Sequence, residues 1–278
     1  MNFGIADIRE MTGAMSQYPG MEYDGYVLSF IFRRLAYIFD KLRVRKKDDF
    51  ISKLEDDAFR EQVKTLMCVE ATEMFRDPSF WRTLRDKILI NSQEENQVIW
   101  FPKTSSGEEP FSLSIILEEM ELSNRYKIIC SCPTKTILDK ITNGEINNKN
   151  FDVNQTNYKR LEKFDKFSDY IRDEGNEKAI NEVVLENIDP ILGSYQLDSN
   201  QTSGVELILY RNESLYLSSK KAETIYNNLV GQLKPGGYLI IGVKDYLPKS
   251  VEERLKRVDS NERIYQKITS QKSIEYGF

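Results

Sequence analysis

The sequence predicts an α/β protein of the doubly wound class, and three of its stretches lead to that prediction. Residues 98–117 have the pattern of a buried apolar strand, a turn of small residues and an amphipathic helix. Residues 205–212 have the pattern of a strand that ends in polar side chains, and residues 218–241 that of a helix, a Pro-Gly-Gly turn and another strand. Strands that alternate with helices in this way indicate a parallel sheet packed against helices.

The first of these stretches, VIWFPKTSSGEEPFSLSIIL, also has the pattern of a ligand-binding turn. Pro102 ends the strand because it has no amide hydrogen to continue a ladder. The following Thr-Ser-Ser-Gly, residues 104–107, allows a tight turn and offers amides and hydroxyls. Glu108 and Glu109 then stand where a helix dipole favours carboxylates. By its pattern alone, the stretch fits a strand–helix unit without a ligand about as well as a nucleotide-like site.

The composition narrows the classes of function. The 278-residue chain has 40% hydrophobic and 30% charged residues, which is ordinary for a globular protein. Its net charge of −5 argues against a general nucleic-acid binder, which needs an excess of lysine and arginine. No apolar run reaches the length of a membrane span, and the N-terminus has no signal-like pattern. We therefore expect a cytoplasmic protein that inserts into no membrane and binds no nucleic acid, and we expect it to be a monomer.

Histidine is absent from the sequence, and the cysteines are Cys68, Cys130 and Cys132. Without histidine, Ser-His and Cys-His catalysis and histidine-ligated zinc are excluded. Three cysteines, of which only two are close in sequence, support neither a disulfide framework nor a four-cysteine metal site. We expect no metal, and a chemistry that relies on binding and orientation rather than on a strong base.

The pattern Trp-x-x-x-x-Ser-Ser-Gly-Glu-Glu-Pro-Phe-Ser, residues 100–112, resembles the first S-adenosylmethionine-binding motif of the CheR family. These chemotaxis receptor methyltransferases esterify glutamate side chains on receptor coiled coils. The resemblance covers nearly the whole chain and implies a Rossmann-like methyltransferase domain at residues 69–278, after a small N-terminal helical domain at residues 1–68. It implies the following cofactor-binding residues within this motif: Lys103, Ser105, Gly107 and Glu109.

The N-terminal region has a helical and locally basic pattern. Residues 21–44 and 49–66 carry apolar side chains at three- and four-residue steps. Basic side chains gather at Arg33, Arg34 and residues 41–47, and such a run usually forms only a solvated face. In the CheR family a basic helix of the N-terminal domain faces the acidic methylation region of the receptor. The resemblance therefore implies a chemotaxis receptor coiled coil as the protein partner.

Residues 69–81, VEATEMFRDPSFW, resemble the family's linker Asn-x-Thr-x-Phe-Phe-Arg, which runs across the cofactor and the substrate channel. Thr72 and Arg76 match this pattern, whereas Glu70 replaces the asparagine. The resemblance implies that both matching residues bind the cofactor. It also implies a catalytic role for Arg76, because a fixed guanidinium can orient a substrate carboxylate through paired hydrogen bonds. The alternative is a surface arginine paired with a neighbouring acid.

The next strand, residues 126–130, is followed by a departure from the family pattern. CheR proteins continue with Thr-Asp-Ile-Asp, and the first acid binds the ribose hydroxyls of the cofactor. This chain has Ser131-Cys132-Pro133-Thr134, so Cys132 stands at the cofactor-binding position. A carboxylate that accepts two such hydrogen bonds contributes roughly 1.5–3 kcal/mol, and its loss predicts binding about 10- to 100-fold weaker. Either another acid compensates, or the chain holds its cofactor less tightly.

Residues 205–217, VELILYRNESLYL, resemble the family pattern Phe-Asp-x-Ile-x-Cys-Arg-Asn-x-x-x-Tyr-Phe. The match puts Arg211 and Asn212 at the carboxyl end of a strand, where open α/β sheets bind ligands. The resemblance implies catalytic roles for Arg211 and for Tyr216, near the transferred methyl, and cofactor binding by Asn212. The alternative is an Arg-Asn pair that only caps the next helix.

Two further interpretations concern the region before that strand. Residues 183–185 have the pattern of a short strand that ends at Asn187, where relatives have an asparagine beside the adenine of the cofactor. Residues 147–182 stand where family members carry a small β insertion, which in some of them docks on a receptor tail. The aromatic side chains of this stretch more often indicate a minor core than a docking site.

The leading hypothesis is an S-adenosylmethionine-dependent O-methyltransferase that esterifies glutamate side chains of chemotaxis receptors or a related protein. Displacement at a sulfonium methyl requires mainly proximity and alignment of the carboxylate, and S-adenosylhomocysteine would be the product. Glutamate is already ionised near neutral pH, so the absence of histidine is no obstacle. The alternative is a degenerate CheR-like binding or scaffold module with weakened or lost cofactor binding.

Overall fold

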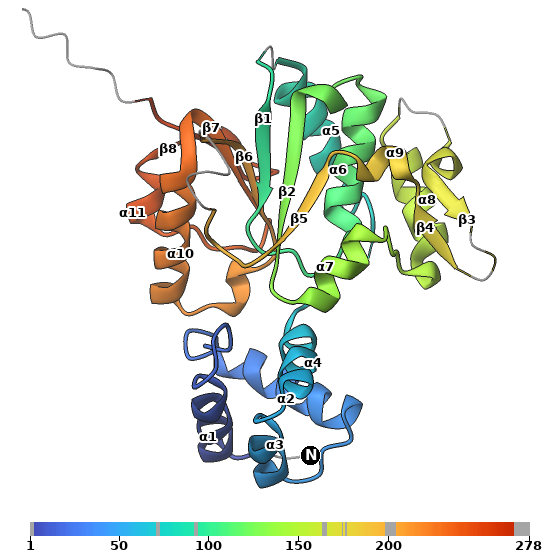
Figure 1. The fold of residues 1–278 in the computed structure, drawn as a ribbon. Helices are drawn as coiled ribbons and strands as arrows, with labels where there is room; N and C mark the ends of the chain where they lie inside the picture. Colours follow the sequence, from blue (N-terminus) through green and yellow to red (C-terminus); the bar gives the residue numbers. More distant parts are fainter. Residues whose placement is uncertain are drawn as a thin grey trace, which may run out of the picture.

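A mixed sheet of seven strands lies at the centre of the described part of the chain (Figure 1). The structure is a computed structural model, and it describes residues 3–70, 73–91, 94–162, 166–173, 175, 177–197 and 204–269. The strands of the sheet are β1 (Gln97–Phe101), β2 (Tyr126–Cys132), β5 (Ile188–Leu192), β6 (Val205–Tyr210), β7 (Leu233–Ile241), β8 (Leu255–Asp259) and β9 (Ile264–Lys267). The predicted α/β class is confirmed.

The order of the strands, β5-β2-β1-β6-β7-β9-β8, reverses direction next to β1. From β1 the chain moves outward through β2 and β5, and it then returns to place β6 on the other side of β1. The strands from β5 to β7 are parallel, and β9 is antiparallel to both of its neighbours. The carboxyl ends of β1 and β6 therefore flank the point where open α/β sheets bind ligands.

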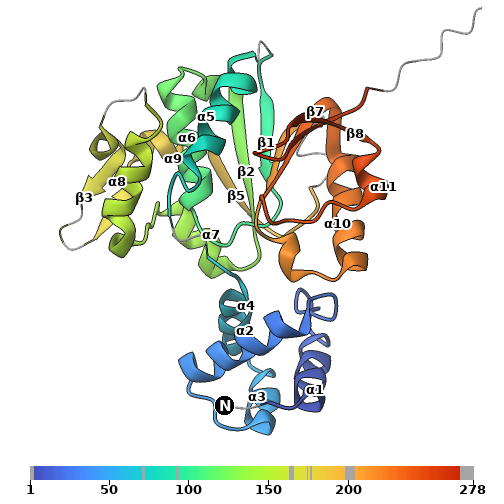
Figure 2. The same cartoon turned by 180° about the vertical axis from the view of Figure 1, so that it is seen from behind.

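Helices cover both faces of the sheet, as the two opposite views show (Figures 1 and 2). The helices after the N-terminal region are α5 (Pro78–Lys87), α6 (Glu108–Glu119), α7 (Lys135–Thr142), α8 (Phe151–Lys159), α9 (Glu182–Leu185), α10 (Ser219–Gln232) and α11 (Lys249–Glu252). Side chains of β1 alternate between two hydrophobic clusters, with Ile99 and Phe101 on the α6 face and Val98 and Trp100 on the α10 face. This strand is buried on both faces, which explains its uninterrupted apolar sequence.

The N-terminal region forms a group of helices with a hydrophobic cluster of its own. They are α1 (Ile5–Met15), α2 (Leu28–Lys41), α3 (Lys47–Lys53) and α4 (Asp57–Met67), and they lie beyond the carboxyl ends of the central strands (Figure 1). The sequence analysis did not predict α1. The helix predicted at residues 49–66 is divided into two, because Asp56 starts a new helix by accepting a hydrogen bond from the amide of Ala58. The domain boundary at residue 68 stays a prediction.

Residues 147–182 contain α8 and the antiparallel pair β3 (Ile171–Asp173) and β4 (Lys178–Ile180). The rings of Tyr158 and Phe167 lie 5.3 and 6.0 Å from the ring of Phe75 and belong to the cluster on the α6 face. These aromatic side chains are therefore part of the core. Docking of a receptor tail on this stretch stays a prediction.

The prediction of a strand at residues 183–185 is wrong, since these residues belong to the short helix α9 (Glu182–Leu185). Asn181 caps this helix by accepting a hydrogen bond from the amide of Val184. Three consecutive apolar residues do not distinguish a strand from a buried helical turn. The strand of this region is β5, which begins after Asn187 rather than before it. Among the described residues, no helix is long and apolar enough to cross a bilayer.

Candidate active site

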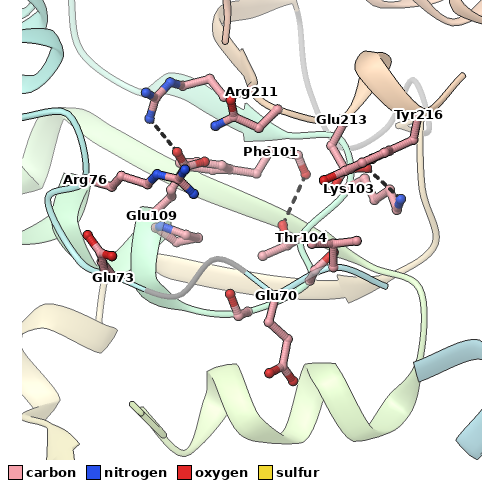
Figure 3. A pocket seen from close by; sticks show the side chains of 15 residues that line it. Glu70, Glu73, Arg76, Phe101, Lys103, Thr104, Glu109, Arg211, Glu213 and Tyr216 are labelled. Carbon is pink, nitrogen blue, oxygen red and sulfur yellow. Dashed lines mark hydrogen bonds and ion pairs between the residues drawn. The ribbon is translucent and has the colours of Figure 1, made fainter. Parts of the chain in front are cut away.

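A cavity lies at the carboxyl ends of β1 and β6, where the strand order reverses (Figure 3). The linker before α5, the turn after β1 and the loop after β6 supply its walls. The lining residues are Val69, Glu70, Glu73, Arg76, Phe101, Lys103, Thr104, Ser105, Ser106, Glu109, Pro110, Arg211, Asn212, Glu213 and Tyr216. Most of the predicted site residues are brought together here: Arg76, Lys103, Ser105, Glu109, Arg211, Asn212 and Tyr216.

The turn after β1 is held against β2 before it enters α6. The amide of Thr104 donates to the carbonyl of Ser131 at 2.8 Å, so this turn continues the sheet for one more residue. Gly107 then precedes the helix with φ at −80°, a value that any residue adopts. A Cβ atom at this position would lie 2.0 Å from the ring of Phe111. Gly107 is therefore required by close packing, and it does not line the cavity.

Arg211 forms the centre of a buried ion network. Its guanidinium donates to Glu109 Oε1 at 2.5 Å and to Asp77 Oδ2 at 2.7 Å, and it lies 4.0 Å from the centre of the Phe80 ring. The Arg211 side chain is only 2% exposed. Burial raises the pKa of Glu109, and the positive charge of Arg211 opposes that shift. The network joins the loop after β6 to the linker and to the first turn of α6.

The linker holds Arg76 in a strained turn. The backbone φ is 52° at Phe75 and 60° at Asp77, on either side of Arg76. A left-handed conformation costs a non-glycine residue about 1–2 kcal/mol, so other contacts must stabilise it. The Phe75 amide donates to Ser112 Oγ at 2.8 Å, and the Asp77 carboxylate accepts from the Arg211 guanidinium. These contacts fix the direction from which Arg76 enters the cavity.

The Arg76 guanidinium differs from the other cations of the cavity. Within the described residues, the lining contributes Arg76, Lys103 and Arg211 as cationic side chains, and Arg76 alone makes no ion pair there. Its side chain is exposed and lies beside Glu109 (Figure 3). The predicted alternative, a surface pair with a neighbouring acid, is not observed in this part of the chain, because Asp77 pairs with Arg211 instead.

Lys103 and Glu213 form a second buried pair, with 2.6 Å between Nζ and Oε2. Burial alone would lower the pKa of Lys103, but the adjacent Glu213 carboxylate raises it well above the usual lysine range. The Lys103 ammonium also lies 5.6 Å from the centre of the Tyr26 ring, which comes from the N-terminal region. Burial also raises the pKa of Glu213, and the Lys103 ammonium opposes that shift. The pair links the loops after β1 and β6.

The loop after β6 is organised by Asp245, which the sequence analysis did not identify as a site residue. Its carboxylate accepts hydrogen bonds from the amides of Asn212 (2.6 Å), Leu215 (3.2 Å) and Gly242 (2.7 Å) and from Ser214 Oγ (3.0 Å). Burial raises the pKa of Asp245 despite these donors. The only signal in the sequence for this role of Asp245 is the presence of an acidic residue in the short turn after the strand β7.

Among the described residues, the predicted cofactor-binding residues that do not line the cavity are Gly107, described above, Cys132 and Asn187. Cys132 is fully buried in the cluster on the α6 face, and burial raises the pKa of its thiol to about 12. Asn187 precedes β5 and lies at the opposite, amino-terminal edge of the sheet, where its carbonyl accepts from the amide of Ile128. Thr72 lies outside the described residues. Residues 193–195 follow the carboxyl end of β5. In this segment the amide of Gly193 donates to the Cys132 carbonyl, and the amide of Tyr195 donates to the Pro102 carbonyl.

A comparison with protein families matches residues 70–264 to the family described as CheR methyltransferase, SAM binding domain. The chain belongs to the CheR methyltransferase family. The relatives include a chemotaxis protein methyltransferase of Listeria innocua, with 23% identity over 84% of each chain. Another is the chemotaxis protein methyltransferase Cher2 of Pseudomonas putida, with 24% identity over 77% of this chain and 80% of the relative.

Among solved structures, the N-methyltransferase NodS of Bradyrhizobium japonicum has a TM-score of 0.38 and 12% identity to this CheR-family chain, over 70% of it and 97% of NodS. That similarity is too low to support a conclusion. S-adenosylmethionine is the cofactor of this CheR-family domain. The residues present fit its amino-acid half, since Glu109 offers a carboxylate for the ammonium group and the start of α6 offers amides for the carboxylate. They do not repeat the family's ribose acid, because Cys132 is neutral and buried.

Proposed function

We propose that this protein is an O-methyltransferase that esterifies glutamate side chains in the cytoplasmic coiled coil of a chemotaxis receptor. The observation that carries the proposal is the guanidinium of Arg76, which is exposed in the cofactor cavity and makes no ion pair with another described residue. An acceptor carboxylate needs such a cation, and arginine holds carboxylates through two parallel hydrogen bonds. The names of the relatives, chemotaxis protein methyltransferases, support the receptor as substrate.

The remaining residues have distinct roles in this proposal. S-adenosylmethionine, when bound, supplies a methyl group on a sulfonium, which a carboxylate oxygen can displace. Glu109 and Ser105 hold the amino-acid half of the cofactor, and Gly107 sets the course of the turn that carries them. Tyr216 and Asn212 shape the wall around the acceptor. We expect no general base, because a glutamate side chain is ionised at neutral pH.

Arg211 has a positioning role rather than direct contact with the acceptor. Its guanidinium already bonds to Asp77 and Glu109 and is almost fully buried. It therefore acts through these two carboxylates, by keeping the strained linker and the first turn of α6 in place. The distinction separates it from Arg76, whose guanidinium faces the cavity with no such bonds in the described part of the chain.

The proposal is tested by incubating the protein with a receptor cytoplasmic fragment and S-adenosylmethionine labelled on the methyl group. We expect label in the receptor that alkali releases as methanol, as a carboxyl ester requires. Arg76→Met should reduce transfer by about 100-fold or more, in line with the loss of roughly 3 kcal/mol of charge-assisted binding in the transition state. Arg76→Lys keeps the charge and should retain more transfer than Arg76→Met. Alkali-stable label, or unchanged transfer in Arg76→Met, would contradict the proposal.

One observation favours the second candidate, a scaffold descended from such an enzyme. The end of β2 offers the buried thiol of Cys132 where family members have an acid. Titration with S-adenosylhomocysteine in a calorimeter separates the candidates. Saturable binding in the micromolar range supports the enzyme, and no heat at millimolar ligand supports the scaffold.

A further inference from the structure

The end of β2 is closed to the ribose of a bound cofactor. In dinucleotide-binding sheets an acid after the second strand bonds to the ribose hydroxyls. Here the Cys132 thiol donates to the carbonyl of Cys130, and the Cys132 carbonyl accepts from the amide of Gly193. The next polar side chain, Thr134, is also buried, and its hydroxyl caps α7 and bonds to Thr65. Neither of these two side chains is therefore available to accept hydrogen bonds from a diol.

The cavity itself contains carboxylates that could replace the missing acid. In the described lining these are Glu70, Glu73, Glu109 and Glu213. Glu109 and Glu213 are held in the two buried ion pairs, so releasing either one would leave a buried charge without a partner. Glu73 lies near Arg76, and its carboxylate accepts from Asn157 Nδ2 at 3.4 Å. The choice therefore falls on Glu70, whose surroundings differ from those of the others.

Glu70 lies on the side of the cavity toward α7, and its carboxylate points toward that helix (Figure 3). Figure 3 shows Glu70 well apart from Arg211, across the cavity. Its carboxylate is 3.5 Å from Nζ of Lys140, a residue of α7, the helix that follows β2. Both side chains of that pair are about half exposed, so the pair contributes little and is easily exchanged for a ligand. The two ends of the cavity thus differ, with the ion network of Glu109 at one end and an available carboxylate at the other.

We propose that Glu70 holds the ribose hydroxyls of S-adenosylmethionine in place of the missing acid after β2. A cofactor whose amino-acid half is held by Glu109 and the start of α6 extends its nucleoside half toward α7, which is the side of Glu70. One ionised carboxylate accepts hydrogen bonds from both hydroxyls of a vicinal diol. The inference rests on the proposed function only in requiring that the cofactor binds.

The test measures binding of S-adenosylhomocysteine by calorimetry to the wild type, to Glu70→Gln and to Glu73→Gln as the matched control. Two hydrogen bonds to a charged acceptor correspond to an affinity loss of about 10- to 100-fold in Glu70→Gln. We expect Glu73→Gln to bind within about threefold of the wild type. Thermal unfolding of each variant checks that the substitution leaves the fold intact.

A ligand without the diol makes the test specific. For the wild type, 2′,3′-dideoxy-S-adenosylhomocysteine should bind weaker than S-adenosylhomocysteine by the same factor that Glu70→Gln causes. For Glu70→Gln, the two ligands should bind with nearly equal affinity, because the partner of the diol is gone. Equal binding of S-adenosylhomocysteine by the wild type and Glu70→Gln would overturn the inference and leave the proposed function intact. The inference would also be overturned if the affinity loss from Glu70→Gln and the affinity loss from removing the diol add independently when the variant binds the ligand without the diol. No binding by the wild type would overturn both.

Discussion

Arg211 and Glu109 form a largely buried pair in which loss of the guanidinium would leave the Glu109 carboxylate without its cation. The guanidinium is buried and bonds to two carboxylates, and Glu109 has only 17% of its side chain exposed. Breaking a buried pair by removing one partner costs more than removing both, since the remaining charge loses both water and partner. This pair also joins segments that lie far apart in the sequence, which a single-sequence pattern does not reveal.

Arg211→Met is therefore expected to lower the free energy of unfolding by about 3–5 kcal/mol. Replacing both partners, in Arg211→Met with Glu109→Gln, should recover a substantial part of this loss. Urea unfolding of the single and double variants measures both effects. A double variant that is less stable than Arg211→Met alone would contradict this account.

Glu108 gives a pH-dependent prediction. Its side chain is buried, and burial raises its pKa above the usual glutamate value. The folded state therefore binds a proton more readily than the unfolded state. The stabilisation that follows is present at pH values below the usual glutamate pKa, and it is lost as the pH rises through the raised pKa of the folded state.

We expect Glu108→Gln to remove this contribution, so its stability relative to the wild type should increase between pH 4 and pH 7. Unfolding midpoints of the two proteins at several pH values measure the difference. Burial also raises the pKa values of Glu109 and Asp245. Both residues are present in the two proteins, so their contributions cancel in the difference between the two curves of stability against pH. Parallel curves would show that Glu108 does not titrate differently in the folded state.

At the scale of elements, the turn between β1 and α6 depends on the absence of a side chain at Gly107. The ring of Phe111, one turn later in the helix, occupies the space that a Cβ atom would need. The sequence analysis predicted cofactor binding for this glycine. The structure gives it a packing role that sets the course of the turn, and the contribution to binding is therefore indirect.

Gly107→Ala should lower the stability by about 1–3 kcal/mol, as expected for overpacking. Gly13→Ala is the matched control, because Gly13 lies within α1 and a Cβ there meets no atom within 4 Å. That control should raise the stability by about 0.5–1 kcal/mol through helix propensity. Thermal unfolding compares the two variants, and an equal effect on both would contradict the packing role.

At the scale of the whole molecule, the N-terminal region contacts the loop that carries Tyr216. The amide of Val27 donates to the Tyr216 carbonyl at 2.9 Å, and the amide of Ser218 donates to the Gly25 carbonyl at 2.8 Å. The ring of Phe30 lies 4.7 Å from the ring of Tyr216. The helices before residue 68 therefore help to position a side chain of the cavity.

Val27→Pro removes one of these hydrogen bonds with little other change, because φ at Val27 is −68° and suits proline. We expect a loss of about 1 kcal/mol in stability and slower methyl transfer, with binding of S-adenosylhomocysteine unchanged. Val27→Ala keeps the amide and serves as the control. If both variants transfer methyl groups equally well, the contact with Tyr216 does not matter for the reaction.

The sequence by itself determined the elements that depend on local pattern. The apolar run of β1, the acidic first turn of α6 and the strand before Arg211 were all predicted, because burial on a sheet and the helix dipole leave short-range signals. The expectation that the turn after β1 and the loop after β6 serve one cofactor came from the resemblance to the CheR family, and not from these signals. Local pattern did not decide the state of residues 183–185, whose few apolar residues fit a strand and a helical turn alike.

Only the tertiary structure decided which side chains reach the cavity. Because β2 continues to Cys132, the two-residue alternation of a strand puts Cys132 on the same buried face as Cys130, away from the cavity. The ion pair of Lys103 with Glu213 joins residues 110 positions apart, and the bonds of Asp245 to the loop after β6 span about 30. Such contacts depend on the packing of whole elements, and a local sequence pattern does not indicate them.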